Sequence, residues 1–370
     1  MKKRYITEQI KTDLKKKMVF VAGARQVGKT TLAKKIVKSG KGYLSWDISE
    51  DREAILKQEL PSTNLIVLDE IHKYHSWRNY LKGLYDKLGD RCRILVIGSA
   101  KLDYYRYGGD SLQGRYHFLR LHPFSVAELK INTYDELLDL LKLSGFPEPF
   151  LGGSEVEAKR WSREYRNRLI NEEITNLENV SDLGNLELLS LRLPQLVGSP
   201  LSINSIREDL QVSHKTVSKW LNILERTYAI FRISPFGSSK LRAVKKEQKH
   251  YHYDWSLIPD LPLRFENMVA MHLLKWVHFE QDTKGRDLEL KYFRDVDGRE
   301  VDFVITENMN PIYLIEAKWK DAEIPKGLKY LKKRFPDVKA YQISAVGKKD
   351  YITLDGIRVL PSLKFLSTLV

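Results

Sequence analysis

The chain has 370 residues, with 62 lysine and arginine side chains against 48 aspartate and glutamate, a formal net charge of +14 and a pI near 9.4. Hydrophobic residues make up 42% of the sequence and charged residues 30%, as in an ordinary globular protein, and no apolar run is long enough to cross a bilayer. The positive charge favours polyanionic partners such as DNA, although a lysine-rich surface without such a partner would give the same count.

The single cysteine and the N-terminus indicate the cellular setting. Cys92 excludes an internal disulfide framework, and we expect it to be buried in an apolar run. The first twenty residues are basic but contain no apolar signal segment. The sequence therefore predicts a cytoplasmic protein without a membrane partner. Its length predicts two to four domains.

Residues 1–128 alternate short apolar runs with helical segments, which predicts a parallel sheet covered on both faces. A helix is expected to follow the first strand and to continue through Val37. The expected strands are Met18–Ala22, Tyr43–Asp47, Leu65–Leu68, Ile94–Ile97 and Tyr116–Leu121.

The segment after the first strand fits the pattern GxxxxGK(S/T) in full and lies between a strand and a helix. Its glycines allow backbone N–H groups to face phosphate oxygens, and the start of the helix adds partial positive charge. We expect Lys29 to reach the β- and γ-phosphates of ATP and the Thr30 hydroxyl to bind Mg²⁺. The predicted site for ATP or ADP comprises Gly23, Ala24, Arg25, Gln26, Val27, Gly28, Lys29, Thr30 and Thr31.

Further side chains are expected to complete a catalytic site around Lys29. Asp69 and Glu70 follow an apolar strand, so Asp69 is predicted to hold Mg²⁺ and Glu70 to orient or deprotonate the attacking water. Ser99 follows the next strand and is a candidate γ-phosphate sensor, or else a cap for the following segment. Arg115 is a candidate arginine finger, in its own chain or toward a neighbouring copy, or else a structural partner of a carboxylate.

Two helical regions are expected after the sheet. Residues 129–182 have helical spacing, broken by a loop at SGFPEPFLGG, and are predicted to form a helical lid. Residues 183–258 are predicted to form a winged-helix domain, whose third helix runs from Ser213 to about Tyr228. Its expected core face comprises Val217, Trp220, Leu221 and Leu224, and its candidate DNA contacts are His214, Lys215 and Lys219. A role in protein contact or packing alone is the alternative.

Residues 259–370 combine a helix, Phe265–Phe279, with strand-like runs that carry acidic residues. Glu266 lies early in the helix and Asp302 on one strand, while Glu316 and Lys318 share a side of the next strand. Such a group can hold one or two Mg²⁺ or Mn²⁺ ions and direct water at a phosphodiester. The alternative is that the same charges pair as salt bridges. We expect His250 and His252, beside Asp254, to be solvated residues of a lysine-rich segment.

Together these motifs resemble a known family. The segments GARQVGKTT, LIVLDEIHK, VIGSA and SLQGRYHFLRLHPFSVAEL are similar to a widespread archaeal and bacterial family of AAA-type ATPases, and to archaeal ATPases near the signal-transduction (STAND) branch. The later segments SGFPEPF, REYRNRLINEEI and SHKTVSKWLNILERTYAIFRISPF fit the same family. Residues 259–370 resemble the restriction-endonuclease-like PD-(D/E)xK core, with Val301 in place of proline. That resemblance implies metal binding by Asp302 and Glu316, catalysis by Lys318 and an accessory role for Glu266.

The expected architecture is therefore α/β: a P-loop sheet, a helical lid, a winged helix and an endonuclease-like domain. The favoured function is Mg²⁺-dependent ATP hydrolysis coupled to DNA or to a DNA-associated partner. One alternative is a nucleotide-gated switch that binds a protein partner and changes its homo-oligomeric state. The other is an ATP-regulated, metal-dependent nuclease.

Overall fold

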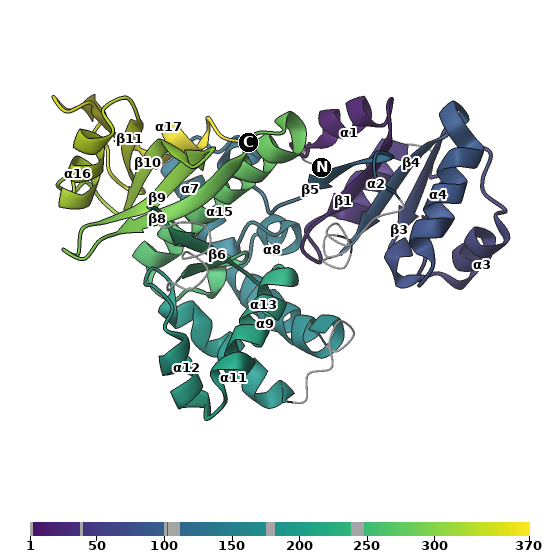
Figure 1. The fold of residues 1–370 in the computed structure, drawn as a ribbon, viewed down its shortest axis with the longest axis horizontal. Helices are drawn as coiled ribbons and strands as arrows, with labels where there is room; N and C mark the ends of the chain where they lie inside the picture. Colours follow the sequence, from purple (N-terminus) through teal and green to yellow (C-terminus); the bar gives the residue numbers. More distant parts are fainter. Residues whose placement is uncertain (1–2, 38–39, 100–101, 103–111, 175–181, 238–247) are drawn as a thin grey trace. The chain divides into compact units, whose positions relative to one another are not determined.

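A computed structural model describes residues 3–37, 40–99, 102, 112–174, 182–237 and 248–370. The chain divides into two compact units (Figure 1). The N-terminal unit comprises residues 1–123 with 282–284, and the C-terminal unit comprises residues 124–281 and 285–370. The finer division into four domains stays a prediction.

The N-terminal unit is built on a five-stranded sheet in the order β2-β3-β4-β1-β5, in which every neighbouring pair is parallel. This arrangement confirms the predicted parallel sheet. Its strands are β1 (Met18–Ala22), β2 (Tyr43–Ser45), β3 (Leu65–Asp69), β4 (Arg93–Gly98) and β5 (Tyr116–Arg120). Its helical segments are α1 (Thr7–Asp13), α2 (Lys29–Val37), α3 (Ser49–Lys57), η1 (Ile71–Lys73), α4 (Trp77–Leu88) and η2 (Gly89–Arg91).

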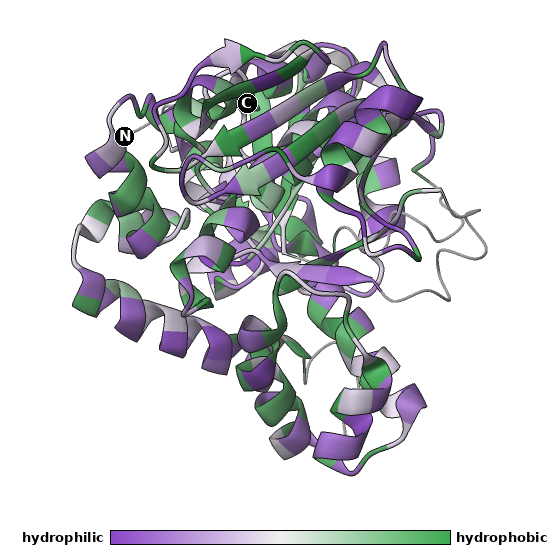
Figure 2. Cartoon of the chain, turned by 90° about the vertical axis from the view of Figure 1, so that its left-hand side faces the viewer, coloured by the Kyte–Doolittle hydropathy of each residue, from purple (hydrophilic) through white to green (hydrophobic). Residues whose placement is uncertain are grey.

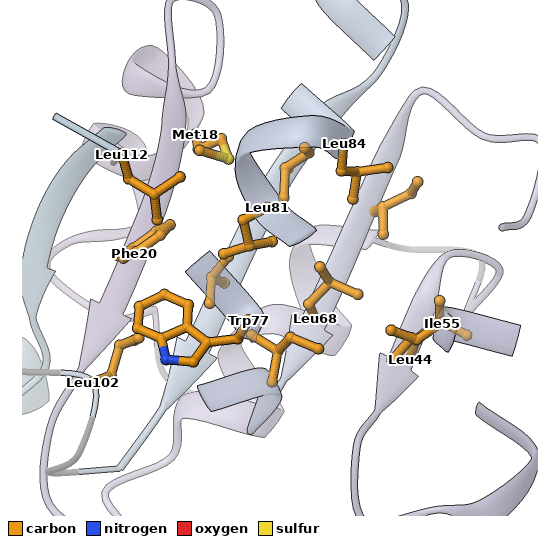
Figure 3. Packing of buried hydrophobic residues seen from close by; sticks show 14 of the residues in the cluster. Met18, Phe20, Leu44, Ile55, Leu68, Trp77, Leu81, Leu84, Leu102 and Leu112 are labelled. Atoms are coloured by element: carbon orange, nitrogen blue, oxygen red, sulfur yellow. The ribbon is translucent and has the colours of Figure 1, made fainter. Parts of the chain in front are cut away.

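The core of this unit forms where α4 packs against the sheet (Figure 3). Trp77, Leu81 and Leu84 are buried and recur at helical spacing, so one face of α4 is apolar. They join Phe20 of β1 and Leu68 of β3 in a single cluster. Because both β1 and β3 end at one edge of a firmly packed sheet, the loops after them have fixed positions.

The C-terminal unit begins with helices and continues into a large sheet. Figure 2 shows that several helices of the chain are hydrophilic on one side and hydrophobic on the other. The segment SGFPEPFLGG was expected to be a loop, but residues 147–152 form a short helix, because proline at the first position of a helix favours its start. The helical segments before the sheet are α6 (Val126–Leu129), α7 (Tyr134–Leu143), α8 (Pro147–Gly152), α9 (Glu155–Arg168), η4 (Leu169–Ile174), α11 (Leu183–Arg192), η5 (Leu193–Leu196), α12 (Ile203–Leu210) and α13 (His214–Arg226).

An eight-stranded mixed sheet, in the order β12-β13-β11-β10-β9-β8-β6-β7, completes this unit. Its strands are β6 (Ile230–Pro235), β7 (Lys249–His252), β8 (Leu288–Arg294), β9 (Glu300–Glu307), β10 (Asn310–Lys318), β11 (Lys339–Ser344), β12 (Tyr351–Ile352) and β13 (Ile357–Pro361). The remaining helical segments are η6 (Trp255–Leu257), α15 (Leu261–Lys284), α16 (Lys326–Arg334) and α17 (Ser362–Leu366). Strands β6 and β7, which lie within the predicted winged-helix domain, continue the C-terminal sheet, since β6 pairs with β7 and with β8. In the described part of the chain, no helix is long and apolar enough to cross a membrane.

Candidate functional site

The predicted phosphate loop lies between β1 and α2, at the edge of the sheet where the parallel strands end. All its predicted residues occupy this turn or the first turn of α2: Gly23, Ala24, Arg25, Gln26, Val27, Gly28, Lys29, Thr30 and Thr31. A Cβ atom at Gly23 would lie 2.3 Å from the carbonyl oxygen of Leu121, and Gly28 has a φ of +99°. Both positions therefore require glycine. Lys29 is buried, and its Nζ donates to the carbonyl oxygens of Gly23 at 2.9 Å and Ala24 at 2.7 Å.

Arg4 fixes the same loop from the N-terminus, although its sequence context, MKKRY, suggested only a basic end. Its guanidinium group is buried and donates to the carbonyl oxygen of Val27 at 2.6 Å and to that of His122. Arg4 thus connects the phosphate loop to the segment after β5.

The two predicted magnesium ligands meet at the end of β3. The Thr30 hydroxyl donates to Asp69 Oδ2 at 3.0 Å, and the Tyr43 hydroxyl donates to the same oxygen. Burial raises the pKa of Asp69, while the hydrogen bond from Tyr43 opposes that shift. Two hard oxygen atoms beside the phosphate loop suit Mg²⁺, so these residues fit the expected ion. Tyr43 was missed, because a tyrosine that begins a short strand carries no local signal for this contact.

Glu70 follows Asp69 in a left-handed conformation, with φ +58°, which is unusual for a residue other than glycine. Its backbone N–H donates to the carbonyl oxygen of Ile97 at 2.9 Å. Its Oε2 lies 3.5 Å from His72 Nε2 and 3.7 Å from Lys73 Nζ. These contacts orient the Glu70 carboxylate, and both partners belong to the motif LIVLDEIHK.

Gly98 makes room for His72, because a Cβ at Gly98 would lie 2.7 Å from His72 Nδ1. Ser99 directly follows Gly98, which pairs with Ala22 just before the phosphate loop. Ser99 therefore lies at the phosphate-loop edge of the sheet, as a γ-phosphate sensor requires. Its backbone carbonyl oxygen accepts a hydrogen bond from the Leu102 N–H at 3.0 Å.

Arg115 lies at the opposite edge of the sheet. Its carbonyl oxygen accepts from the N–H of Met18, the first residue of β1, at 3.1 Å. Its Nε donates to Asp86 Oδ1 at 3.2 Å. Five residues of a strand span roughly 16 Å, so Arg115 is too far from the phosphate loop of its own chain to contact phosphate there. Residues 103–111, which precede Leu112 and include the first residue of the segment SLQGRYHFLRLHPFSVAEL, lie outside the described residues.

The predicted DNA-contacting helix is α13. Ser213 caps it by accepting from the Thr216 N–H at 3.1 Å. As expected, the core face comprises buried residues: Val217, Trp220, Leu221 and Leu224. Another face is exposed and carries positive charge, with residues recurring at intervals of four, three and four: Lys215, Lys219, Asn222 and Arg226. His214 is also exposed at the start of the helix. Much of the lysine-rich segment after β6, residues 238–247, lies outside the described residues.

The four predicted nuclease-like residues converge in the C-terminal unit. The backbone N–H of Asp302 donates to Glu316 Oε2 at 3.3 Å, and the N–H of Ala317 donates to Asp302 Oδ2 at 2.9 Å. Lys318 Nζ lies 2.6 Å from Glu316 Oε1. Burial and the charge of Asp302 raise the pKa of Glu316, and the same two causes raise the pKa of Glu266.

Lys249 of β7 and Glu300 of β9 complete this carboxylate cluster, which we define as Glu266, Glu300, Asp302, Glu316, Lys249 and Lys318. The Tyr251 hydroxyl donates to Glu266 Oε1 at 2.8 Å. Lys249 is fully buried, forms an ion pair with Glu300 and lies 3.9 Å from Glu266 Oε1. Burial alone would lower the pKa of Lys249, but the charges of Glu266, Asp302 and Glu300 raise it above its ordinary value. Lys249 was missed because the segment KKEQKHYHY resembles an exposed, charged strand.

As arranged, the cluster does not fit a divalent ion. Both oxygens of Glu316 and one of Asp302 already accept hydrogen bonds or an ion pair. Across the described ranges, no group of three or more His, Cys, Asp and Glu side chains is arranged to hold a metal. The implied second Mg²⁺ or Mn²⁺ site is therefore at odds with these contacts.

The expectation that His250 and His252 are solvated was wrong. Both are buried, because β7 is covered by η5 and α15: His250 Nε2 lies 2.9 Å from the carbonyl oxygen of Leu193, and the His252 N–H donates to Asn267 Oδ1 at 2.7 Å. Burial lowers the pKa of His250 to about 4 and that of His252 to about 3. Asp254 is also buried and accepts from Ser162 Oγ at 2.6 Å.

The strand order, the glycine loop and the acidic residues at the end of β3 define a P-loop nucleotide-binding domain. Residues 15–130 match the sequence profile described as the AAA domain, so this part of the chain is similar to AAA-type P-loop ATPases. Residues 134–267 and 264–365 match profiles described as domains of unknown function, DUF8612 and DUF4143.

Two similar proteins match most of the chain at low identity. The chain is 21% identical over 318 residues to an uncharacterized protein of Mycobacterium tuberculosis (strain ATCC 25618 / H37Rv), a match that covers 80% of this chain and 71% of the relative. It is 21% identical over 291 residues to an uncharacterized protein of Haemophilus influenzae, covering 72% and 69%.

Solved structures with partial likeness include a Walker-type ATPase of Pyrococcus abyssi, with a TM-score of 0.45 and 14% identity over 69% of this chain and 94% of that chain. The Orc1 protein of Aeropyrum pernix in complex with DNA has a TM-score of 0.36 and 14% identity over 68% and 90%. At these TM-scores, neither likeness indicates a substrate or a partner for this chain.

Proposed function

We propose that this ATPase hydrolyses ATP with Mg²⁺ and couples hydrolysis to DNA or to a DNA-associated partner. The observation that carries the catalytic part is the contact between Thr30 Oγ1 and Asp69 Oδ2 beside the phosphate loop, which brings together two residues 39 positions apart. A Ser or Thr after the loop lysine and an Asp at the end of a neighbouring strand are the residues that hold Mg²⁺ in P-loop ATPases, and this pair has that arrangement.

Each side chain at this edge has a separate task in hydrolysis. The phosphate-loop N–H groups and Lys29 bind the phosphates, and Thr30 with Asp69 would hold Mg²⁺, which neutralises charge on the phosphate oxygens. Glu70 orients the attacking water and accepts its proton, while His72 and Lys73 keep its carboxylate in place. Ser99 would contact the γ-phosphate from the end of β4.

Arg115 acts toward a neighbouring copy of the chain in this proposal. Its position at the far edge of the sheet excludes its own phosphate loop, and its ion pair with Asp86 leaves the side chain partly exposed. An arginine presented at the surface of one copy can stabilise phosphate charge in another.

Support for DNA comes from α13 and from the net charge of +14. Lys215, Lys219 and Arg226 share an exposed face of one helix, where they suit contact with DNA phosphates. Binding through such contacts weakens steeply as salt concentration rises.

The test of DNA coupling compares two double variants of equal charge change. Lys215→Glu with Lys219→Glu should abolish binding of a fluorescent duplex at low salt, measured by anisotropy, and should remove DNA stimulation of ATP hydrolysis. The control, Lys326→Glu with Lys329→Glu on exposed positions of α16, should retain both. Equal loss in the two variants would show that general charge, and not α13, attracts DNA. If the parent chain binds no duplex at low salt, DNA coupling is wrong and the protein-binding switch becomes the better explanation.

A further inference from the structure

A buried lysine lies inside the carboxylate cluster of the C-terminal unit. We infer that Lys249 is the resident cation of this cluster, in the place that a divalent metal would occupy, so that the cluster binds no Mg²⁺ or Mn²⁺ while Lys249 is present. This inference is independent of ATP hydrolysis in the N-terminal unit.

The position of Lys249 brings carboxylates from separate elements around one ammonium group. Its Nζ forms an ion pair with Glu300 of β9 and lies 3.9 Å from Glu266 Oε1 of α15. Asp302, also on β9, adds to the negative potential around it. Since Lys249 is fully buried, its charge has no compensation from bulk water and depends on these carboxylates.

The charges of the cluster explain why a cation is needed there. Four carboxyl groups, Glu266, Glu300, Asp302 and Glu316, face two lysines, Lys249 and Lys318. Buried carboxylates repel each other unless a positive charge lies among them. An ammonium ion and a divalent metal supply the same compensation, and each repels the other at such short range.

The remaining contacts show carboxylates committed to protein donors. Asp302 Oδ2 accepts from a backbone N–H, Glu316 is held by the Asp302 N–H and by Lys318, and Glu266 accepts from the Tyr251 hydroxyl. Gly198 lies beside Glu266, since a Cβ added at Gly198 would lie 3.7 Å from Glu266 Oε2. A metal ion would have to displace Lys249 and also break several of these hydrogen bonds.

The experiment titrates Mn²⁺ into the 370-residue chain without nucleotide. Electron paramagnetic resonance measures the concentration of free Mn²⁺, and the Mn²⁺ that is missing from this signal gives the number of bound ions. The parent carries Asp69→Asn, which removes the expected ligand in the N-terminal unit. The parent should show no saturable site. Lys249→Ala in that background should gain one site, which binds Mn²⁺ at least about 10-fold more tightly than any residual binding by the parent. Lys249→Arg keeps the positive charge and should gain none. Adding Asp302→Asn to Lys249→Ala should remove the gained site.

Two results would overturn the inference. One is a saturable Mn²⁺ site in the parent that Asp302→Asn abolishes, since metal would then bind beside Lys249. The other is a folded Lys249→Ala chain, checked by circular dichroism, that gains no site. If Lys249→Ala does not fold, the parent and its Asp302→Asn derivative decide the matter: equal Mn²⁺ binding supports the inference, and loss of binding contradicts it.

Discussion

Arg4 lies 23 residues before Val27, yet its guanidinium group donates to the Val27 carbonyl oxygen within the phosphate loop. Hydrogen bonds from a buried charged group contribute about 1.5–3 kcal/mol each. Arg4→Ala should therefore lower the free energy of unfolding of the N-terminal unit by about 2–4 kcal/mol and weaken ADP binding several-fold. Thermal denaturation and titration with a fluorescent ADP analogue measure the two effects. Lys3→Ala, at an exposed neighbour that pairs with Glu8, should change neither quantity.

The buried histidines of β7 make a prediction about pH. His250 and His252 stay neutral in the folded chain because burial lowers the pKa of each, to about 4 and about 3, whereas an unfolded histidine becomes charged below about pH 6.5. The unfolded state thus binds more protons, and their contribution to stability is lost as pH falls from about 6.5 toward 4. His252→Phe should reduce the slope of the unfolding free energy over this range by about 1.4 kcal/mol per pH unit. Denaturant titrations at several pH values measure the slope, and an unchanged slope would contradict the burial of His252. His214→Phe, at an exposed site, is the control.

At this scale, the sequence predicted contacts between residues that belong to recognisable motifs better than contacts of residues outside them. Thr30 and Asp69 were expected together because each belongs to a known local pattern. Arg4, Tyr43 and Lys249 were missed because none lies in a recognisable motif, although their partners lie between 17 and 118 residues away. A buried lysine in particular has the same local sequence as an exposed one.

At the scale of elements, hydrophobic spacing located most helices and strands. The parallel sheet of the N-terminal unit was predicted because its strands are buried on both faces and read as continuous apolar runs. The membership of β6 and β7 in the C-terminal sheet was not predicted, because strand pairing depends on residues such as Ser234 and Lys291, which are far apart in sequence.

Arg115, the residue directly before strand β5, carries a prediction about assembly. Because Arg115 lies at the wrong edge of its own sheet, Arg115→Ala should slow ATP hydrolysis by about 10³-fold only if a neighbouring copy uses this side chain. Asp86→Ala removes the ion-pair partner of Arg115 but leaves the guanidinium group, so it should retain activity. Equal activity of Arg115→Ala and the parent would instead assign Arg115 a structural role.

At the scale of the whole molecule, action by a neighbouring copy requires an oligomer. Mixing Arg115→Ala chains with Glu70→Gln chains should restore hydrolysis above the sum of the separate activities, because some sites then combine an intact Glu70 with an intact Arg115. Light scattering of the same mixtures with ADP and with an ATP analogue reports assembly. A mixture whose activity equals the sum, despite assembly, would rule out this arrangement.

We propose that the phosphate-loop edge of the N-terminal unit hydrolyses ATP and that DNA stimulates this reaction. Steady-state phosphate release from ATP, with and without duplex DNA, tests it most directly when the parent is measured beside Lys29→Ala and Glu70→Gln. We predict hydrolysis that rises several-fold with DNA, is lost in Lys29→Ala, and falls at least about 100-fold in Glu70→Gln, which still binds nucleotide. Hydrolysis that survives both substitutions would contradict the assigned site, and hydrolysis that needs both residues but ignores DNA would contradict the coupling.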